Sequence, residues 1–145
     1  FIFQSTNLMR NFTAYENITI TRMLQGYSKE EAFAKAHQVM ADLGLDHIDE
    51  TRMAQELSGG QQQRLAFARA IIPDFTVLFG DEPTGNLDVE TGHSIVKLLK
   101  EICAQGSAIL MITHNLNLLT EYPGKVYRFA NHHIEEVTNS NGSIE

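Results

Sequence analysis

The sequence predicts an α/β fold with a largely parallel sheet. Two runs of mostly apolar residues, 75–80 and 108–113, have the length of strands. Helical patterns of apolar residues precede the first run and separate it from the second. Strands that alternate with helices along a chain are typical of α/β folds, in which helices connect parallel strands. We therefore expect helices packed against a parallel sheet.

The first half of the chain contains one clearly delimited helix. Residues 28–43 place apolar side chains on one face, and Ser28 with Glu31 forms a capping box, a pattern that begins helices. Gly44 supplies the stop signal. Two earlier segments are less regular: 1–3, which has the pattern of the end of a buried strand, and 7–17, which shows no clean period.

In the second half of the chain, expected helices and strands alternate more regularly. Asp88 is the expected cap of an amphipathic helix that ends at Gly106. The run 108–113 is almost wholly apolar, which is the pattern of a strand in a sheet buried on both faces. The remaining expected elements are a helix start at 116–120, strands at 126–129 and 133–137, and a frayed polar tail at 138–145.

Composition narrows the class of protein. The 145 residues are 43% hydrophobic and 20% charged, as in globular proteins, and the net charge of −7 argues against a nucleic-acid partner. No apolar run has the length of a membrane span. Cys103 is the only cysteine, which fits a reducing compartment, and we expect it to be a small buried residue. A start at Phe1, within an apolar strand, suggests a fragment.

The run from Leu57 to Arg64, Leu-Ser-Gly-Gly-Gln-Gln-Gln-Arg, is the most informative motif. Ser58 suits a helix N-cap, and Gly59 and Gly60 let backbone N–H groups approach an anion closely. By itself such a turn is usually only a helix cap. Its interest rises because a second polar motif lies downstream.

That second motif is a pair of carboxylates, Asp81 and Glu82, directly after the strand expected at 75–80. Open α/β sheets bind ligands at the carboxyl ends of their strands. In a phosphate-handling site, Asp81 would hold Mg²⁺ and Glu82 would deprotonate an attacking water. The same residues, followed by Pro83, also fit a simple turn after a strand.

Two further polar residues follow expected strands. His114 comes after 108–113 and could hydrogen-bond to a terminal phosphate, and Gln4 comes after 1–3 and could contact Mg²⁺. Alternatively, each could be a strand-end residue satisfied by nearby backbone. Four such features in this order favour the functional interpretation.

Together these motifs resemble the nucleotide-binding domain of ABC-type ATPases. The resemblance covers 1–137 and includes the Q-loop at Gln4, the signature at 57–61, Walker B at 77–82, the D-loop at 85–88 and the H-loop at His114. It implies an incomplete P-loop NTPase (RecA-like) core with a mostly parallel sheet, plus the helical subdomain of ABC proteins. The corresponding divisions are a helical and signature subdomain at 5–74, a core part at 75–137 and a flexible tail at 138–145.

The resemblance also implies roles for residues. Gln4 and Asp81 would serve Mg²⁺, Glu82 would be the catalytic base, and His114 would sense the γ-phosphate. The signature residues of one subunit would grip ATP bound by the other: Ser58, Gly59, Gly60 and Gln61. The D-loop residues would communicate across the dimer: Asn86, Leu87 and Asp88.

One motif of the family is missing from this sequence. No Gly-x-x-x-x-Gly-Lys-Ser/Thr run occurs, so the backbone cradle and the lysine that bind the β- and γ-phosphates are absent. In the family the P-loop strand lies in the centre of the sheet. We therefore expect that this segment alone neither hydrolyses ATP nor folds well, and that the parent protein carries the missing part.

The run 83–88 resembles the branch that holds the ATPases FtsE, LolD and MacB, and 113–124 looks most like FtsE. The resemblance implies a second ABC ATPase subunit, in a homodimer, and an integral membrane permease-type partner. The domain would be cytoplasmic and peripheral on the inner face of the plasma membrane. Candidates for contact with the partner are Leu8, Met9, Phe12 and Tyr15, which could equally cover the chain's own core.

Two other functions remain open from the sequence. One is a non-transport ABC ATPase, although 4–58 leaves no room for the long coiled coil of the repair and chromosome proteins. The other is a non-hydrolysing partner that contributes only its signature motif. The presence of Glu82 and His114 argues against that role.

Overall fold

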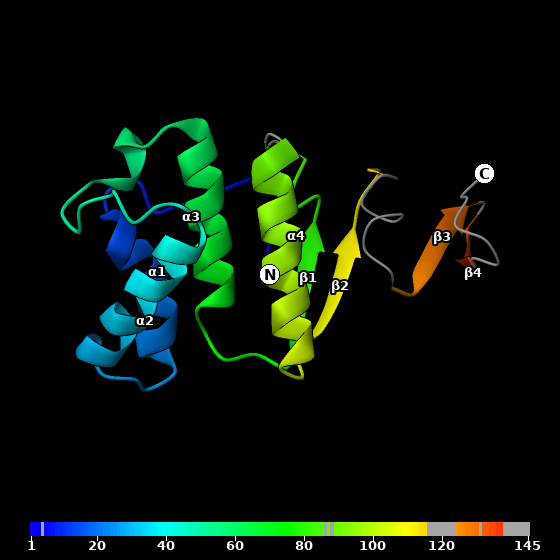
Figure 1. The fold of residues 1–145 in the computed structure, drawn as a ribbon, viewed down its shortest axis with the longest axis horizontal. Helices are drawn as coiled ribbons and strands as arrows, with labels where there is room; N and C mark the ends of the chain where they lie inside the picture. Colours follow the sequence, from blue (N-terminus) through cyan, green and yellow to red (C-terminus); the bar gives the residue numbers. More distant parts are fainter. Residues whose placement is uncertain (4, 86, 88, 116–123, 131, 138–145) are drawn as a thin grey trace. The chain divides into compact units, whose positions relative to one another are not determined.

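The computed structural model describes residues 1–3, 5–85, 87, 89–115, 124–130 and 132–137. The chain divides into two compact units, unit 1 at Phe1–Ile112 and unit 2 at Thr113–Glu145. Figure 1 shows three helices gathered at one side of unit 1, with α4 and two strands at the other.

Three helices form the first part of unit 1: α1 (Ala14–Leu24), α2 (Lys29–Asp42) and α3 (Gly59–Ile71), with the short 3₁₀ helix η1 (Ala54–Glu56) before α3. Each of the three begins at a capping box, in which an N-cap hydroxyl and the side chain three residues later bond each other's backbone N–H. The N-caps are Thr13, Ser28 and Ser58. The helix expected after Ser28 is confirmed, and Gly44 follows it at φ 64°.

Helix α1 is the element that the sequence pattern did not reveal. Its middle contains four consecutive β-branched residues at 18–21, a composition with low helix propensity. The helix is held by tertiary contacts instead, since Tyr15 and Ile18 are buried in the core and α1 packs on both α2 and α3. Tyr15 therefore belongs to the core rather than to a docking surface.

The sheet of unit 1 pairs β1 (Val77–Asp81) with β2 (Ala108–Ile112) in parallel, with Val77 opposite Ala108 and Asp81 opposite Ile112. Helix α4 (Val89–Ala104) connects the two strands, and Gly106 at φ 104° follows it. On the other side of β1, Ile2 forms a parallel bridge with Gly80. The expected parallel arrangement is confirmed for this pair of strands.

One expectation about this sheet is wrong: only one of its faces is buried. Leu78 is buried and belongs to the same core cluster as Ile95 and Leu99 of α4. On the opposite face, Leu110 is 54% and Ile112 65% exposed, because nothing among the described residues of unit 1 packs over them. We call this surface the open face; its members are Phe1, Phe3, Val77, Phe79, Leu110 and Ile112. Cys103, expected to be buried, is also exposed, since it lies on the outer side of α4.

The described part of unit 2 is a hairpin. Strands β3 (Val126–Ala130) and β4 (His133–Val137) pair antiparallel, with Val126 opposite Val137. Both strands were expected from the sequence; the helix start at 116–120 and the tail at 138–145 lie outside the described residues. Within the part of the chain that the structure describes, no helix is both long and apolar enough to span a bilayer.

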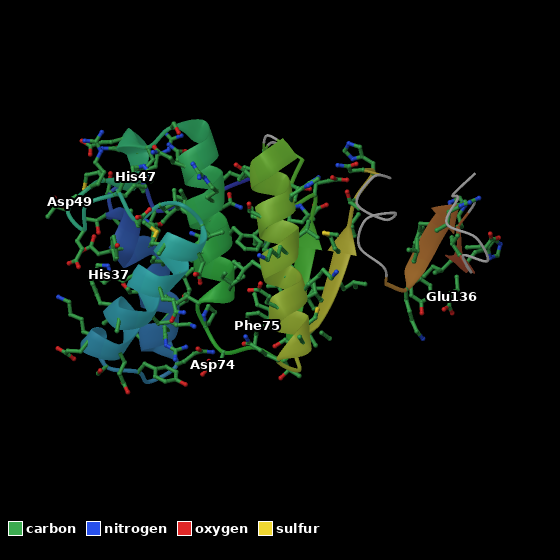
Figure 2. All side chains as sticks on the ribbon, in the orientation of Figure 1. His37, His47, Asp49, Asp74, Phe75 and Glu136 are labelled. Atoms are coloured by element: carbon green, nitrogen blue, oxygen red, sulfur yellow. The ribbon has the colours of Figure 1, made fainter. Side chains whose placement is uncertain are left out.

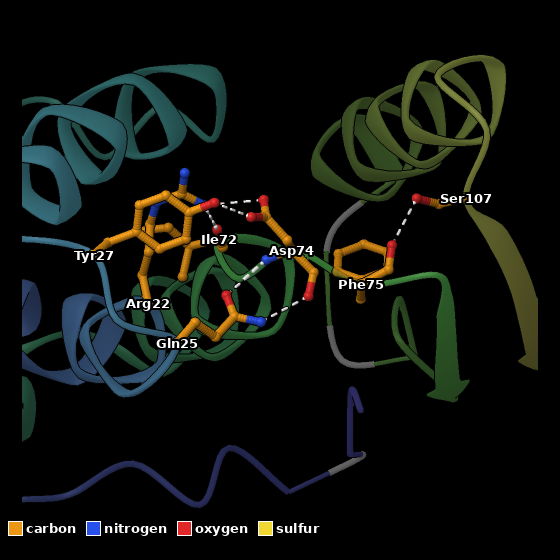
Figure 3. A network of polar contacts seen from close by, with 7 residues as sticks. All are labelled: Arg22, Gln25, Tyr27, Ile72, Asp74, Phe75 and Ser107. Carbon is orange, nitrogen blue, oxygen red and sulfur yellow. Dashed lines mark hydrogen bonds and ion pairs between the residues drawn. The ribbon is translucent and has the colours of Figure 1, made fainter.

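The connector between α3 and β1 is fixed by a polar network centred on Asp74 (Figure 3). Arg22 Nη1 donates to Asp74 Oδ1 at 3.2 Å and to the Ile72 carbonyl at 3.0 Å, and the Tyr27 hydroxyl donates to Asp74 Oδ2. The Gln25 side chain accepts from the Asp74 N–H and donates to the Asp74 carbonyl. This network ties the end of α1 to the segment that leads into β1.

Candidate functional site

The predicted acidic pair lies at the carboxyl end of the parallel strands. Asp81, the last residue of β1, donates its N–H to the Ile2 carbonyl at 2.9 Å, and Glu82 donates its N–H to the Ile112 carbonyl at 2.9 Å. The chain segments at Ile2, Asp81 and Ile112 therefore end side by side at one edge of the sheet. Asp81 is exposed and Glu82 is half-buried. This is the edge where α/β sheets bind ligands.

A sharp turn follows the strand and sets the direction of Glu82. Glu82 has φ 47°, in the left-handed region that non-glycine residues seldom occupy. Pro83 is fully buried and packs against Gly80, where an added Cβ would lie 3.4 Å from the Pro83 ring, an ordinary van der Waals distance. The Gly85 N–H donates to the Glu82 carbonyl at 3.1 Å and closes the turn. Backbone strain of this kind is common at functional sites.

The signature turn has the predicted geometry of a capped helix start. Ser58 Oγ accepts from the Gln61 N–H at 3.3 Å, and Gln61 Oε1 accepts from the Ser58 N–H at 2.9 Å. Leu57, buried at 7% exposure, anchors the turn to the core. Cβ atoms added at Gly59 or Gly60 would meet nothing within 4 Å. The first turn of α3 is therefore open to solvent, and first-turn N–H groups lack partners within their helix.

The remaining residues predicted for the site lie outside the strand edge and the signature turn, or outside the described residues. Gln4, Asn86 and Asp88 lie outside the described residues. Leu87 is described and packs partly against the core, while its N–H donates to the Thr84 carbonyl at 3.1 Å. His114 is exposed and belongs to unit 2, two residues after the end of β2. Within unit 1 the strand edge unites Asp81 with Glu82, and the signature turn stands on a separate element.

Two exposed histidines outside the predicted motifs have specific partners. His47 Nε2 lies 3.1 Å from Gln61 Nε2, and His37 Nδ1 lies 3.0 Å from the Tyr15 hydroxyl. His37 Nε2 also lies 2.7 Å from Glu50 Oε1. Burial of the Tyr15 hydroxyl, together with nearby carboxylates, raises the Tyr15 pKa. No periodicity or motif in the sequence signals these pairs, because each joins residues 13 to 22 positions apart in the chain.

The donor groups fit a phosphate compound and Mg²⁺ in different ways. The uncovered N–H groups at Gly59 and Gly60 suit an anion, whereas Asp81 offers one exposed carboxylate. Among the described residues, no three His, Cys, Asp or Glu side chains gather as a complete metal site. Mg²⁺ in phosphate-handling proteins is commonly held by one or two carboxylates and by the substrate's own phosphates. A single carboxylate at the strand edge is compatible with that mode.

Comparison with known proteins places these motifs in a family. Residues 1–85 match the family model described as ABC transporter. The lipoprotein-releasing system ATP-binding protein LolD of Rhodopseudomonas palustris is 44% identical over 120 residues, covering 81% of this chain and 51% of that protein. The macrolide export ATP-binding/permease protein MacB of Mannheimia succiniciproducens is 39% identical over 118 residues, covering 81% of this chain and 18% of that protein.

Solved structures agree with the sequence matches. The dimeric structure of a bacterial ABC transporter cassette is 34% identical, with a TM-score of 0.74, and covers 81% of this chain and 52% of that one. A post-hydrolysis state of an ATP-binding cassette, bound to ADP and Pi, gives 32% identity and a TM-score of 0.75. The chain spans about half the length of the LolD relatives that it matches.

Proposed function

The chain belongs to the ABC transporter family, and from this premise we propose that it takes part in ATP hydrolysis that powers a membrane complex. The observation that carries the proposal is the open, serine-capped first turn of α3, which presents backbone N–H groups to an anion. The work powered is export, lipoprotein release or cell-division signalling. Relatives of the LolD and MacB types support the first two, and the likeness of 113–124 to FtsE, which falls partly outside the described residues, supports the third.

In this proposal the signature serves a nucleotide held by another subunit. The sequence has no P-loop, so the groups that hold the β- and γ-phosphates come from outside these 145 residues. Ser58, Gly59, Gly60 and Gln61 of one copy contact the terminal phosphate of ATP bound by a second copy, which makes the functional form a homodimer. The dimeric state of the solved cassette supports this arrangement.

The strand edge carries the chemistry in the proposal. Glu82 accepts a proton from the water that attacks the γ-phosphate, and its position in a strained turn at the end of β1 supports that role. Asp81 and Gln4 hold Mg²⁺, which when bound neutralises charge on the phosphates. His114 contacts the γ-phosphate, and Asn86, Leu87 and Asp88 communicate between the subunits.

The proposed membrane partner docks on the side of unit 1 that holds 6–10. A pocket of about 180 Å³ is lined there by Thr6, Leu8, Arg10, Ala54, Gln55 and Gln62. Of the four apolar residues considered from the sequence, only Phe12 has a large exposed surface, at 39%. Contact with an integral membrane permease would place the domain in the cytoplasm, peripheral to the inner face of the plasma membrane.

The proposal is tested in the full-length, P-loop-bearing protein. Glu82→Gln removes the base and is expected to reduce the ATPase rate at least about 100-fold while ATP still induces dimers. Gly60→Asp has room to fold, since nothing lies within 4 Å of its Cβ, but its carboxylate repels the phosphate and abolishes both activity and dimers. Gln105→Glu adds the same charge at an exposed residue after α4 and serves as the matched control.

The outcomes separate the alternatives. Unchanged hydrolysis in Glu82→Gln would contradict the assignment of Glu82 as the base. A parent protein that by itself does not hydrolyse ATP would point to a subunit that contributes only its signature. Unchanged hydrolysis in Gly60→Asp would contradict the phosphate contact itself. For the docking surface, Arg10→Cys in a Cys103→Ser background is expected to crosslink to the permease, and Gln105→Cys is not.

A further inference from the structure

The Gln61 side chain bridges two parts of unit 1. Its Oε1 accepts the Ser58 N–H at 2.9 Å, and its Nε2 lies 3.1 Å from Nε2 of His47. His47 lies in the segment between α2 and η1, outside the signature motif (Figure 2). The helix cap that shapes the signature turn is therefore connected, through one amide, to a residue 14 positions earlier in the chain.

The chemistry of this bridge is determined by its fixed end. A backbone N–H can only donate, so the atom of Gln61 that faces Ser58 is the amide oxygen and the atom that faces His47 is the NH₂ group. An NH₂ group donates, so Nε2 of His47 must accept. A neutral imidazole with its proton on Nδ1 satisfies the contact, whereas an imidazolium, with hydrogen on both nitrogens, does not.

His47 is held in place by its own turn. Its neighbours Leu45 and Ile48 are buried, at 0% and 6% exposure, and the Ile48 N–H donates to the Leu45 carbonyl at 3.0 Å. The turn follows Gly44, whose positive φ permits the change of direction after α2. A second tie comes from α3, where Arg64 Nη1 donates to the Leu43 carbonyl at 3.2 Å.

Gln61 and Arg64 are three residues apart and therefore share a face of α3. That face is bonded to the turn at two points, the Leu43 carbonyl and the His47 ring. The imidazole consequently stands on an anchored support rather than on a loose loop. A partner on such a support can restrict the rotamers of Gln61.

We propose that His47 is a positioning residue for the phosphate-facing turn of the signature. By accepting from Gln61, it holds the amide oxygen against the Ser58 N–H and so keeps the first turn of α3 in one conformation. Loss of the acceptor frees the amide, weakens one half of the capping box and loosens Ser58 and Gly59. The inference rests on the proposed function, because a fixed conformation of this turn matters only if the turn binds a phosphate.

The test compares three variants of the full-length, P-loop-bearing protein. His47→Leu removes the acceptor, His47→Gln restores an acceptor at similar reach, and Asp46→Asn alters an exposed neighbour in the same turn as a control. We expect His47→Leu to raise the apparent KM for ATP about 3- to 10-fold, the loss of one hydrogen bond, with an unchanged melting temperature. His47→Gln and Asp46→Asn should stay within about 2-fold of the parent protein.

A second readout is independent of turnover. The side-chain amide of Gln61 gives a pair of ¹H–¹⁵N signals, which we expect to shift in His47→Leu and to return toward their original positions in His47→Gln. The inference is overturned if His47→Leu leaves both the signals and the KM unchanged, or if His47→Gln fails to rescue them. If Gly60→Asp also leaves activity intact, the proposed function fails; if only the His47 variants are silent, the failure is confined to this inference.

Discussion

At the scale of single residues, Asp74 shows how one exposed carboxylate can organise a connector. Hydrogen bonds from the Tyr27 hydroxyl and from Arg22 hold the pKa of Asp74 below its ordinary value. The hydrogen bond between Tyr27 and Asp74 also raises the pKa of the Tyr27 hydroxyl. The guanidinium of Arg22 also lies over the Tyr27 ring, 3.8 Å from its centroid. The three side chains therefore act as a unit.

We predict that Asp74→Asn lowers the free energy of unfolding by about 1 kcal/mol at pH 7, a small value because the carboxylate is exposed and its ion pair is screened. Because the pKa of the Asp74 carboxyl is lower in the folded than in the unfolded protein, its bonds stabilise the fold fully at pH values above the unfolded pKa of about 4. This stabilisation is lost as the pH falls through the pKa of the folded state. The difference between parent and variant should therefore be constant from pH 5 to 7 and shrink below pH 4 in urea unfolding experiments.

The double variant provides the control for this prediction. Because Tyr27 and Asp74 share a bond, Tyr27→Phe should cost little once Asp74→Asn is present, so the two changes should not add. Full additivity, or a difference between parent and Asp74→Asn that persists at pH 3, would contradict the assigned role of the hydroxyl.

At the scale of elements, Asn17 joins α1 to the segment before it. It is fully buried, and its Oδ1 accepts the Met9 N–H at 2.8 Å. Its Nδ2 donates to the carbonyls of Met9 and Thr13, both at 3.0 Å. The amide thus adds to the few backbone bonds of this stretch, such as the one from the Phe12 N–H to the Met9 carbonyl at 3.1 Å, and it supports the residues that line the proposed docking pocket.

We predict that Asn17→Ala destabilises the protein by about 2–3 kcal/mol, because it leaves the Met9 N–H without its partner in a partly buried place and removes three-way bonding of a buried amide. The measurement is the free energy of unfolding in urea. Asn11→Ala, at an exposed position in the same segment, should change it by less than about 0.5 kcal/mol. Equal effects of the two substitutions would contradict the account of Asn17.

At the scale of the whole molecule, the open face is the outstanding feature of unit 1. Phe1 stacks on Phe3 and on Phe79, with ring centroids 4.5 and 5.7 Å apart, yet all three rings remain exposed. The LolD relatives are about twice as long as the segment matched here. We expect the additional part of a full-length protein to cover this face, since buried apolar surface stabilises a fold and an exposed patch promotes association.

We predict that Leu110→Lys has little effect on the stability of the 145-residue chain and a large effect on that of the full-length protein. In the 145-residue chain, where Leu110 is 54% exposed, the unfolding free energy should change by less than about 0.5 kcal/mol and binding of the dye ANS should fall. In the full-length, P-loop-bearing protein the same substitution buries a charge and should lower the melting temperature markedly.

Leu78→Ala is the matched control on the covered face of the same sheet. Leu78 is 1% exposed, so its truncation should cost about 2–5 kcal/mol in both contexts. A large loss of stability from Leu110→Lys in the short chain would show that the face is covered there. The short chain is also expected to show no ATPase activity, for lack of a P-loop.

Much of the local structure could be predicted from the sequence, because its causes lie within a few residues. The capping boxes at Ser28 and Ser58 each depend on a side chain three residues later, and the strands at β1, β2, β3 and β4 depend on short apolar or alternating runs. The order of the signature, the acidic pair and His114 identified the family, which the comparisons then confirmed. Helix α1 was not predicted because its β-branched centre has low helix propensity, which its packing against α2 and α3 overrides.

Only the tertiary structure decided which distant residues meet. Asp74 contacts side chains 47 to 52 positions away, and Gln61 meets His47 across a turn whose path no local pattern specifies. The exposure of Leu110 and Ile112 is likewise a matter of what packs above them, because an apolar strand has the same sequence whether one face or both are covered. The sequence by itself determined the elements and the chemistry at their ends; the fold decided their partners, since contacts between distant segments depend on the course of the whole chain.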